Sequence, residues 1–116
     1  MQQPYRHRVN RREFLNLPGF HAGAYVMAYV EDTSERGLER YGDGFENPHP
    51  RMLLQIADCE KHIDLEFELY SPHQRMNSFH KIQALIDALE EFKAGMAEES
   101  TLYKRREREG KDAKGS

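Results

Sequence analysis

The stretch HIDLEFELY, residues 62–70, decides the fold. Apolar and polar residues alternate along its whole length. Because successive side chains of a strand point to opposite faces, one face is apolar and the other is mostly acidic. We therefore predict a strand with one face on a core and one face toward water, and we expect it to be central in its sheet. The apolar face carries Ile63, Leu65, Phe67 and Leu69, and the polar face carries His62, Asp64, Glu66, Glu68 and Tyr70.

Two earlier segments have the same two-residue period. Residues 22–31 (AGAYVMAYVE) place Ala and Val on one face and Tyr25, Met27 and Tyr29 on the other. Residues 51–58 (RMLLQIAD) form the next predicted strand. The short link 58–61 joins it to residues 62–70, and so short a link can only join antiparallel neighbours. The acidic row of residues 62–70 should then share a sheet face with the Tyr25 row.

A long helix should follow this last strand. Ser71 is a good N-cap, Pro72 suits the first helical position and Gln74 completes a capping box. Spacings of three and four residues then define one apolar stripe: Met76, Phe79, Ile82, Leu85, Ile86, Leu89, Phe92 and Met96. A helix from Pro72 to Arg108 would be about 55 Å long. After Gly95 it must project beyond the sheet, fold back or pack on another subunit.

The expected fold is therefore α+β: a small antiparallel sheet of three to four strands with one long C-terminal helix packed on one face, in the order β-β-β-α. Residues 1–11 are expected to be a flexible basic arm, residues 12–103 a single domain and residues 104–116 a charged, disordered tail. Between residues 12 and 20, we favour an extended segment that turns back at Pro18-Gly19 over a short helix. Residues 32–50 should form a long connection, with room for one helical turn near residues 34–40.

Composition restricts the class of protein. The chain has 116 residues, enough for one domain, and 32% of them are charged. Its single cysteine excludes an intramolecular disulfide and favours a reducing compartment. The N-terminal residues lack the apolar stretch of a secretory signal, and no segment has the length of a membrane span. We therefore expect a cytoplasmic protein without a membrane partner.

Charge is distributed unevenly along the chain. The net charge is −3, yet both ends are basic and the body between them is acidic. Arginine with interleaved aromatic residues can contact phosphates and stack on bases. Nucleic-acid binding is therefore the alternative function. The acidic body disfavours it, because negative charge repels a polyanion. Its candidate contacts are Arg6, Arg8, Arg11, Arg12, Lys104, Arg105, Arg106 and Arg108.

Catalytic motifs are absent from the sequence, so we expect a non-enzymatic protein without a cofactor. Cys59 and His62 have a C-x-x-H spacing that could suit zinc. However, His73 and His80 lie beyond the far end of a nine-residue strand, about 25–30 Å away. We therefore expect no metal site and read Cys59 as a plain turn residue. An acid–base group in the long connection is a weaker alternative, formed by Asp43, Glu46 and His49.

Protein contact is the function that the sequence favours. If the helix covers one sheet face, the aromatic row on the other face needs a cover, because large exposed apolar patches mark interaction sites. The N-terminal segment could supply that cover, but we favour a homodimer. The connection 32–50 and the C-terminal helix are the expected contact elements. The candidate contact residues are Tyr25, Met27, Tyr29, Tyr41, Phe45, Leu53 and Glu66.

Overall fold

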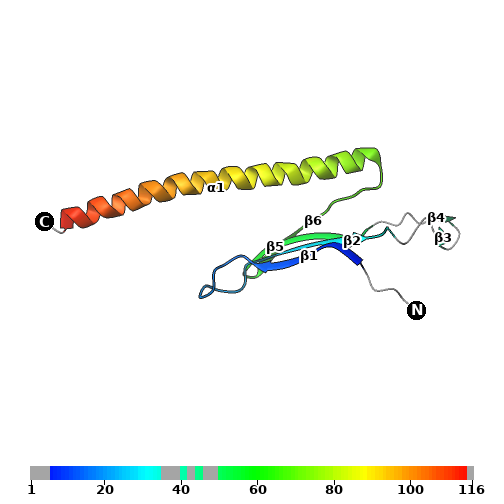
Figure 1. Ribbon diagram of the computed structural model, residues 1–116, viewed down its shortest axis with the longest axis horizontal. Coiled ribbons are helices and arrows are strands. Elements are labelled where there is room, and N and C mark those ends of the chain that lie inside the picture. The colour runs from blue at the N-terminus through cyan, green and yellow to red at the C-terminus, as the bar shows by residue number, and fades with distance from the viewer. Residues whose placement is uncertain (1–5, 35–39, 42–43, 46–49, 115–116) are drawn as a thin grey trace. The chain divides into compact units, whose positions relative to one another are not determined.

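The computed structural model describes residues 6–34, 40–41, 44–45 and 50–114. An antiparallel sheet is followed by one long helix, so the predicted α+β class is confirmed (Figure 1). The chain divides into two compact units, residues 1–75 with the sheet and residues 76–116 with most of the helix. The packing of the helix on a sheet face remains a prediction. Among the described residues, no helix is both long and apolar enough to cross a membrane.

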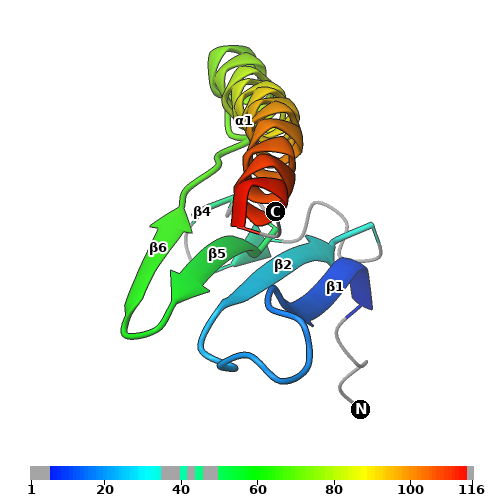
Figure 2. The ribbon, with the colours of Figure 1, turned by 90° about the vertical axis from the view of Figure 1, so that its left-hand side faces the viewer.

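Four antiparallel strands form the main sheet, in the order β1-β2-β5-β6 (Figure 2). They are β1 (Arg6–Phe14), β2 (Tyr25–Asp32), β5 (Met52–Asp58) and β6 (Lys61–Leu65). A separate two-stranded ladder, β3 (Arg40–Tyr41) with β4 (Gly44–Phe45), lies within the long connection. The sheet reaches the upper end of the predicted strand number because the N-terminal segment adds β1.

The register confirms the predicted faces of the sheet. Met27 pairs with Gln55, and Gln55 pairs with Asp64, so the acidic row does share a face with the Tyr25 row. On the opposite face, Val26 pairs with Ile56, which pairs with Ile63. Each face of the central strands is continuous across the sheet because neighbouring residues in register point the same way.

The predicted central position of residues 62–70 is wrong. The strand β6 ends at Leu65 and lies at the edge of the sheet, paired with β5. Leu65, Phe67 and Leu69 are nevertheless partly buried, while Glu66, Glu68 and Tyr70 are exposed. The alternation thus continues along an extended chain after the ladder ends. A period of two residues reports an extended backbone, and it does not report whether a neighbouring strand is paired.

The structure gives regular secondary structure to residues of both predicted arms. Residues 6–11, expected to be flexible, belong to β1 and pair with β2. This strand carries no apolar alternation because its side chains are exposed, and backbone ladder bonds form regardless of side-chain polarity. Residues 104–114, expected to be a disordered tail, continue the helix α1 (Pro72–Lys114). Lys and Arg are good helix formers and also suit the C-terminal end of a helix dipole.

Two local predictions are confirmed. The Phe20 N–H donates to the Leu17 carbonyl at 3.1 Å, and Gly19 has φ of +97°, so the chain turns at Pro18-Gly19 as a type II turn requires. The Gln74 N–H donates to Ser71 Oγ at 3.2 Å, so Ser71 caps α1. The Gln74 side chain instead donates to Glu68 Oε2 at 2.9 Å. The helix runs without a break through Gly95 and has 43 residues, about 65 Å.

Few side chains are fully buried in the described part of the chain. They include Ala24, Ala57 and Glu31, the last at only 2% exposure. The Glu31 carboxylate accepts the Arg51 backbone N–H at 3.1 Å, and the Glu31 N–H donates to the Arg51 carbonyl at 2.9 Å. These bonds offset part of the cost of burying a carboxylate. They also fix the start of β5 against the end of β2.

Candidate functional site

A hydrogen-bonded row crosses the sheet face that carries the predicted aromatic contacts. The Tyr25 hydroxyl donates to Gln55 Oε1 at 3.0 Å, and Gln55 Nε2 donates to Asp64 Oδ1 at 2.7 Å. The Arg12 guanidinium lies over the Tyr25 ring, 5.8 Å from its centroid. The polar groups of β2, β5 and β6 on this face are thus joined to one another within the chain.

The remaining predicted sheet contacts lie on the same face. Tyr29 meets the His7 ring edge to face, with centroids 4.9 Å apart. Met27, Tyr29 and Leu53 are half-buried, whereas Glu66 is exposed beyond the end of β6. Whether they contact a partner remains a prediction. Tyr41 and Phe45 lie in β3 and β4, and their side chains are outside the described part, as are Asp43, Glu46 and His49.

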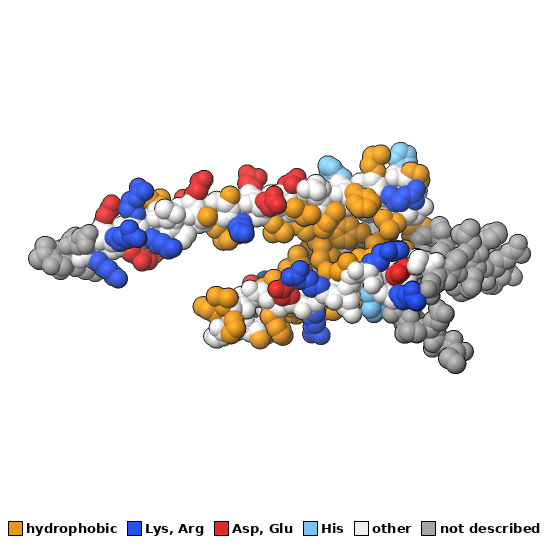
Figure 3. Space-filling view, viewed as in Figure 1, with side chains coloured by type: hydrophobic (Ala, Val, Ile, Leu, Met, Phe, Trp, Pro, Cys, Tyr) orange, Lys and Arg blue, Asp and Glu red, His pale blue; other side chains and the backbone are white. Residues whose placement is uncertain are grey.

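An exposed apolar surface lies along α1. We name its central part the apolar seam: Ile82, Leu85, Leu89, Phe92, Met96 and Tyr103. Their spacing of three and four residues, with one step of seven, places them on one side of a helix. Leu89, Phe92, Met96 and Tyr103 are 55–67% exposed. Figure 3 shows hydrophobic side chains gathered over the N-terminal half of α1 and charged side chains along its C-terminal half.

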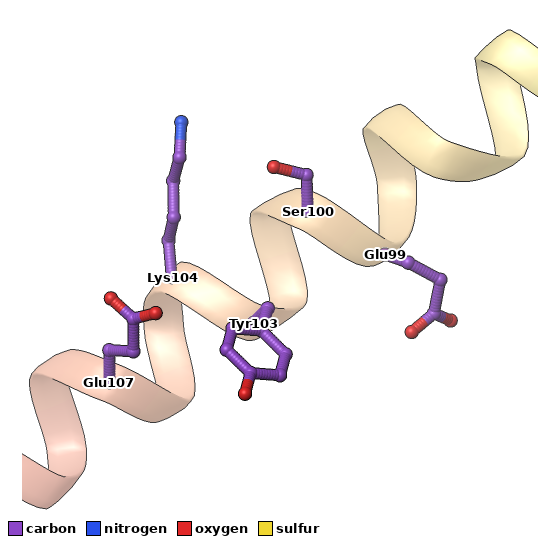
Figure 4. A pocket seen from close by; sticks show the side chains of 5 residues that line it. All are labelled: Glu99, Ser100, Tyr103, Lys104 and Glu107. Carbon is purple, nitrogen blue, oxygen red and sulfur yellow. The ribbon is translucent and has the colours of Figure 1, made fainter. Parts of the chain in front are cut away.

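A surface pocket on α1 does not qualify as an active site. Its lining residues are Glu99, Ser100, Tyr103, Lys104 and Glu107, which all belong to the one helix. In Figure 4, the Tyr103 ring and the Lys104 side chain project to opposite sides of the helix. No second element walls the space among the lining residues, so substrate could not be shielded from water there.

Neither group of predicted nucleic-acid contacts forms a continuous basic surface within its own element. In β1, Arg8 pairs with Asp32 at 3.2 Å, Arg11 pairs with Glu13, and Arg12 lies over Tyr25. In α1, Lys104, Arg105 and Arg106 are consecutive, so they point around the helix about 100° apart. Neither group aligns its charges as a groove that tracks a phosphate backbone would.

The end of β2 carries a carboxyl with a lowered pKa, that of Asp32. The hydroxyl and the backbone N–H of Ser34 both bond to Asp32, and this lowers the pKa of Asp32 below its usual value of 3.8. Arg8 and Arg6 lower the pKa further, while partial desolvation opposes them. Asp32 therefore stays ionised and holds β1 to β2 at this edge.

A cluster of three metal-ligand types lies at the opposite end of the strands, where sequence analysis placed none. His21 Nε2 lies 3.9 Å from Asp58 Oδ1, and Cys59 Sγ lies 3.9 Å from both His21 ring nitrogens. The three ligand atoms all lie within 4.8 Å of one another, and the side chains are exposed. The cluster does not include His62, His73 or His80. The C-x-x-H spacing of Cys59 and His62 therefore did not indicate which histidine lies near Cys59. The usable signal was antiparallel pairing, which brings the start of β2 beside the end of β5.

No family profile, curated protein sequence or solved structure matches this chain.

Proposed function

We propose that this protein is a small non-enzymatic interaction protein that acts as a homodimer, with the apolar seam of α1 as the dimer contact. The exposure of Leu89, Phe92 and Met96 carries the proposal. Burying one such side chain stabilises by about 1.5–3 kcal/mol, so a helix that leaves several in water gains substantially from a partner. The single cysteine keeps the cytoplasm as the expected location.

The spacing of the seam favours another helix as its partner. Steps of three and four residues average 3.5, the repeat that keeps one side of a helix facing a second helix in a coiled coil. Beside the seam, the small residues Ala88 and Gly95 leave space for the close approach of a second helix. A second copy of the chain carries the same seam, and two-fold dimers are the commonest oligomers.

Charge favours an antiparallel pair. Glu99 lies on the seam between Met96 and Tyr103. A parallel, in-register pair would place Glu99 against Glu99 and the basic residues 104–106 side by side, and both juxtapositions are unfavourable. An antiparallel pair centred between Glu90 and Glu91 separates these charges to opposite ends. It also places Leu89 opposite Phe92 and Leu85 opposite Met96 of the second copy.

The sheet face supports the dimer less than α1 does. Tyr25 is hydrogen-bonded to Gln55, and Tyr29 contacts His7, so both aromatic residues have partners within the chain. Nucleic-acid binding has no comparable observation in its favour, since three of the four candidate arginines in β1 engage acidic or aromatic side chains.

Sedimentation equilibrium tests the dimer directly. The wild-type chain should be dimeric at micromolar concentration. Phe92→Glu should be monomeric, because burying two new carboxylates in the seam costs roughly 3 kcal/mol or more, over a hundredfold in dimer affinity. Ala94→Glu adds the same carboxylate on the opposite side of α1 and should remain dimeric. A monomeric wild-type chain at high micromolar concentration would contradict the proposal, as would equal behaviour of the two variants.

Spin labels test the orientation. A nitroxide at Thr101, in a Cys59→Ser background, lies about ten residues from the proposed centre. In the antiparallel pair the two labelled backbone positions should be about 30 Å apart along the helix axis. In a parallel pair they would lie side by side, so a short label distance would contradict the antiparallel arrangement. A label at Asp87, close to the centre, should give a short distance and serves as the control.

A further inference from the structure

The cluster of His21, Asp58 and Cys59 lies where two turns of the sheet meet. His21 belongs to the connection between β1 and β2, Asp58 is the last residue of β5, and Cys59 begins the turn between β5 and β6. The Cys59 N–H donates to the Gly23 carbonyl at 3.0 Å, which joins the two turns. A Cβ on Gly23 would lie 3.1 Å from Cys59 Cα, so glycine permits this close approach. Backbone contacts therefore hold the three side chains near one another.

From this arrangement we infer that His21, Asp58 and Cys59 form a binding site for a divalent transition-metal ion of the zinc class. An imidazole, a carboxylate and a thiolate are the three ligand types that zinc takes in proteins. The sulfur ligand distinguishes the site from calcium and magnesium sites, which are built from oxygen. The inference concerns the sheet unit and does not rest on the dimer.

The distances suit a tetrahedral ion after small side-chain movements. Bond lengths of about 2.0–2.3 Å place tetrahedral ligand atoms about 3.3–3.6 Å apart. The two contacts of His21 Nε2, to Asp58 Oδ1 and to Cys59 Sγ, are both 3.9 Å. Exposed side chains close such a gap by rotation. Water would take the fourth position, since the cluster offers three ligands and faces solvent.

Asn16 is the positioning residue of this site. Its Nδ2 donates to the His21 carbonyl at 2.9 Å and lies 3.2 Å from His21 Nε2. The Gly23 N–H donates to His21 Nδ1 at 3.3 Å. This bond makes Nδ1 an acceptor, so the proton of the neutral ring lies on Nε2. Binding the ion through Nε2, the nitrogen nearer Asp58, moves that proton to Nδ1 and ends the Gly23 contact. The ion would displace the Asn16 contact to Nε2, while the bond to the His21 carbonyl keeps the turn in place.

A catalytic relay fits the same residues less well. In a thiol–imidazole–carboxylate relay, thiol and carboxylate use different ring nitrogens. Here Asp58 approaches Nε2, and Cys59 Sγ is equally far from both nitrogens. All three side chains are exposed, so they do not exclude water from a reacting group. Metal binding is therefore the chemistry that the geometry favours.

Cobalt is the spectroscopic probe for this site. One equivalent of Co²⁺ added to the reduced full-length protein should produce a thiolate-to-cobalt charge-transfer band in the near ultraviolet, and Zn²⁺ should remove the band by displacement. Cys59→Ser should abolish the band. His21→Gln and Asp58→Asn should each weaken Co²⁺ binding at least tenfold. Asn16→Ala should weaken binding about tenfold yet reach the same band at saturation, as expected of a positioning residue.

His62→Gln is the matched control, because His62 has the C-x-x-H spacing from Cys59 but does not belong to the cluster. It should bind Co²⁺ like the wild-type protein. The absence of a charge-transfer band in the wild-type protein would overturn the inference. So would a band that His62→Gln removes and His21→Gln leaves unchanged. Circular dichroism of each variant establishes that the fold is retained, and Phe92→Glu, the monomeric variant, should bind Co²⁺ unchanged.

Discussion

The sheet and α1 differ in how their polar groups are hydrogen-bonded and in how much apolar surface they leave exposed. In the sheet, Tyr25, Gln55 and Asp64 form a hydrogen-bonded row across three strands, and Glu31 is buried against the start of β5. In α1 the backbone is satisfied internally, but Leu89, Phe92 and Met96 remain mostly in water. The sheet thus depends on contacts between segments of one chain, whereas the helix has an apolar surface left over.

This difference indicates where stability comes from in each region. Strand pairing joins distant segments, so stability of the sheet does not depend on protein concentration. Helical stability in proteins comes mostly from packing an apolar face, and an isolated helix gains little from propensity alone. If a second copy supplies that packing, the stability of α1 beyond residue 85 depends on concentration.

The largest effect is expected from crowding the sheet. Ala57 is 4% exposed and lies between Tyr25 and His62 in neighbouring strands. Ala57→Leu should destabilise the protein by about 1–3 kcal/mol, because a close-packed site has no room for the added carbons. Urea unfolding followed by fluorescence of the tyrosines measures the loss. Ala94→Leu, the same change on the exposed side of α1, should be nearly neutral, and an equal loss in both would show that the two regions are not different.

The second expected effect is a change in hydrogen exchange on dilution, which should occur in α1 but not in the sheet. Hydrogen exchange of the amides in residues 85–103 should speed up at least tenfold, about 1.4 kcal/mol, when the protein is diluted well below its dimer dissociation constant. The amides of β2 and β5 should not change. Phe92→Glu at high concentration should reproduce the diluted pattern. If strands and helix change together, the two regions unfold as one unit and the comparison fails.

A smaller effect is expected from one hydroxyl of the sheet. Tyr25→Phe removes the donor to Gln55 Oε1 and leaves that oxygen partly buried without it. The expected loss is about 0.5–1.5 kcal/mol, measured by the shift of the urea midpoint. Tyr103→Phe removes a hydroxyl from the exposed part of α1 and is the matched control. If Tyr103→Phe lowered the stability as much as Tyr25→Phe, hydroxyl hydrogen bonds would stabilise the helix as well as the sheet, and the contrast between the two regions would fail.

The smallest expected effect is the dependence of stability on low pH through the Asp32 carboxyl. The Ser34 hydrogen bonds lower the pKa of Asp32, so the folded-state pKa lies below the unfolded-state value. The contribution of Asp32 to stability is therefore present above the unfolded pKa and is lost as pH falls through the folded pKa. Ser34→Ala should move the pKa of Asp32 back toward 3.8, as followed by NMR titration of its carboxyl carbon. An unchanged pKa would show that the Ser34 hydroxyl is not the main cause.

Sequence patterns predicted the elements better than their pairing. The strands around Met27 and Gln55, the turn at Pro18-Gly19 and the cap at Ser71 all follow from local residue preferences. The strand β1 was missed because its exposed arginines give no period, and the edge position of β6 was missed because alternation continues to Leu69 without a paired neighbour. The helix was expected to end early because charge was read as disorder, although Lys, Arg and Glu favour helices.

The sequence by itself determined the α+β class, the faces of the central strands and the seam of α1, because these depend on local periods of two and 3.6 residues. Only the tertiary structure brought His21 to Asp58 and Cys59. His21 lies far from Asp58 and Cys59 in the chain, and their proximity depends on the pairing of β2 with β5 and on the two turns that this pairing sets side by side. Such proximity is a property of register, which no local pattern encodes.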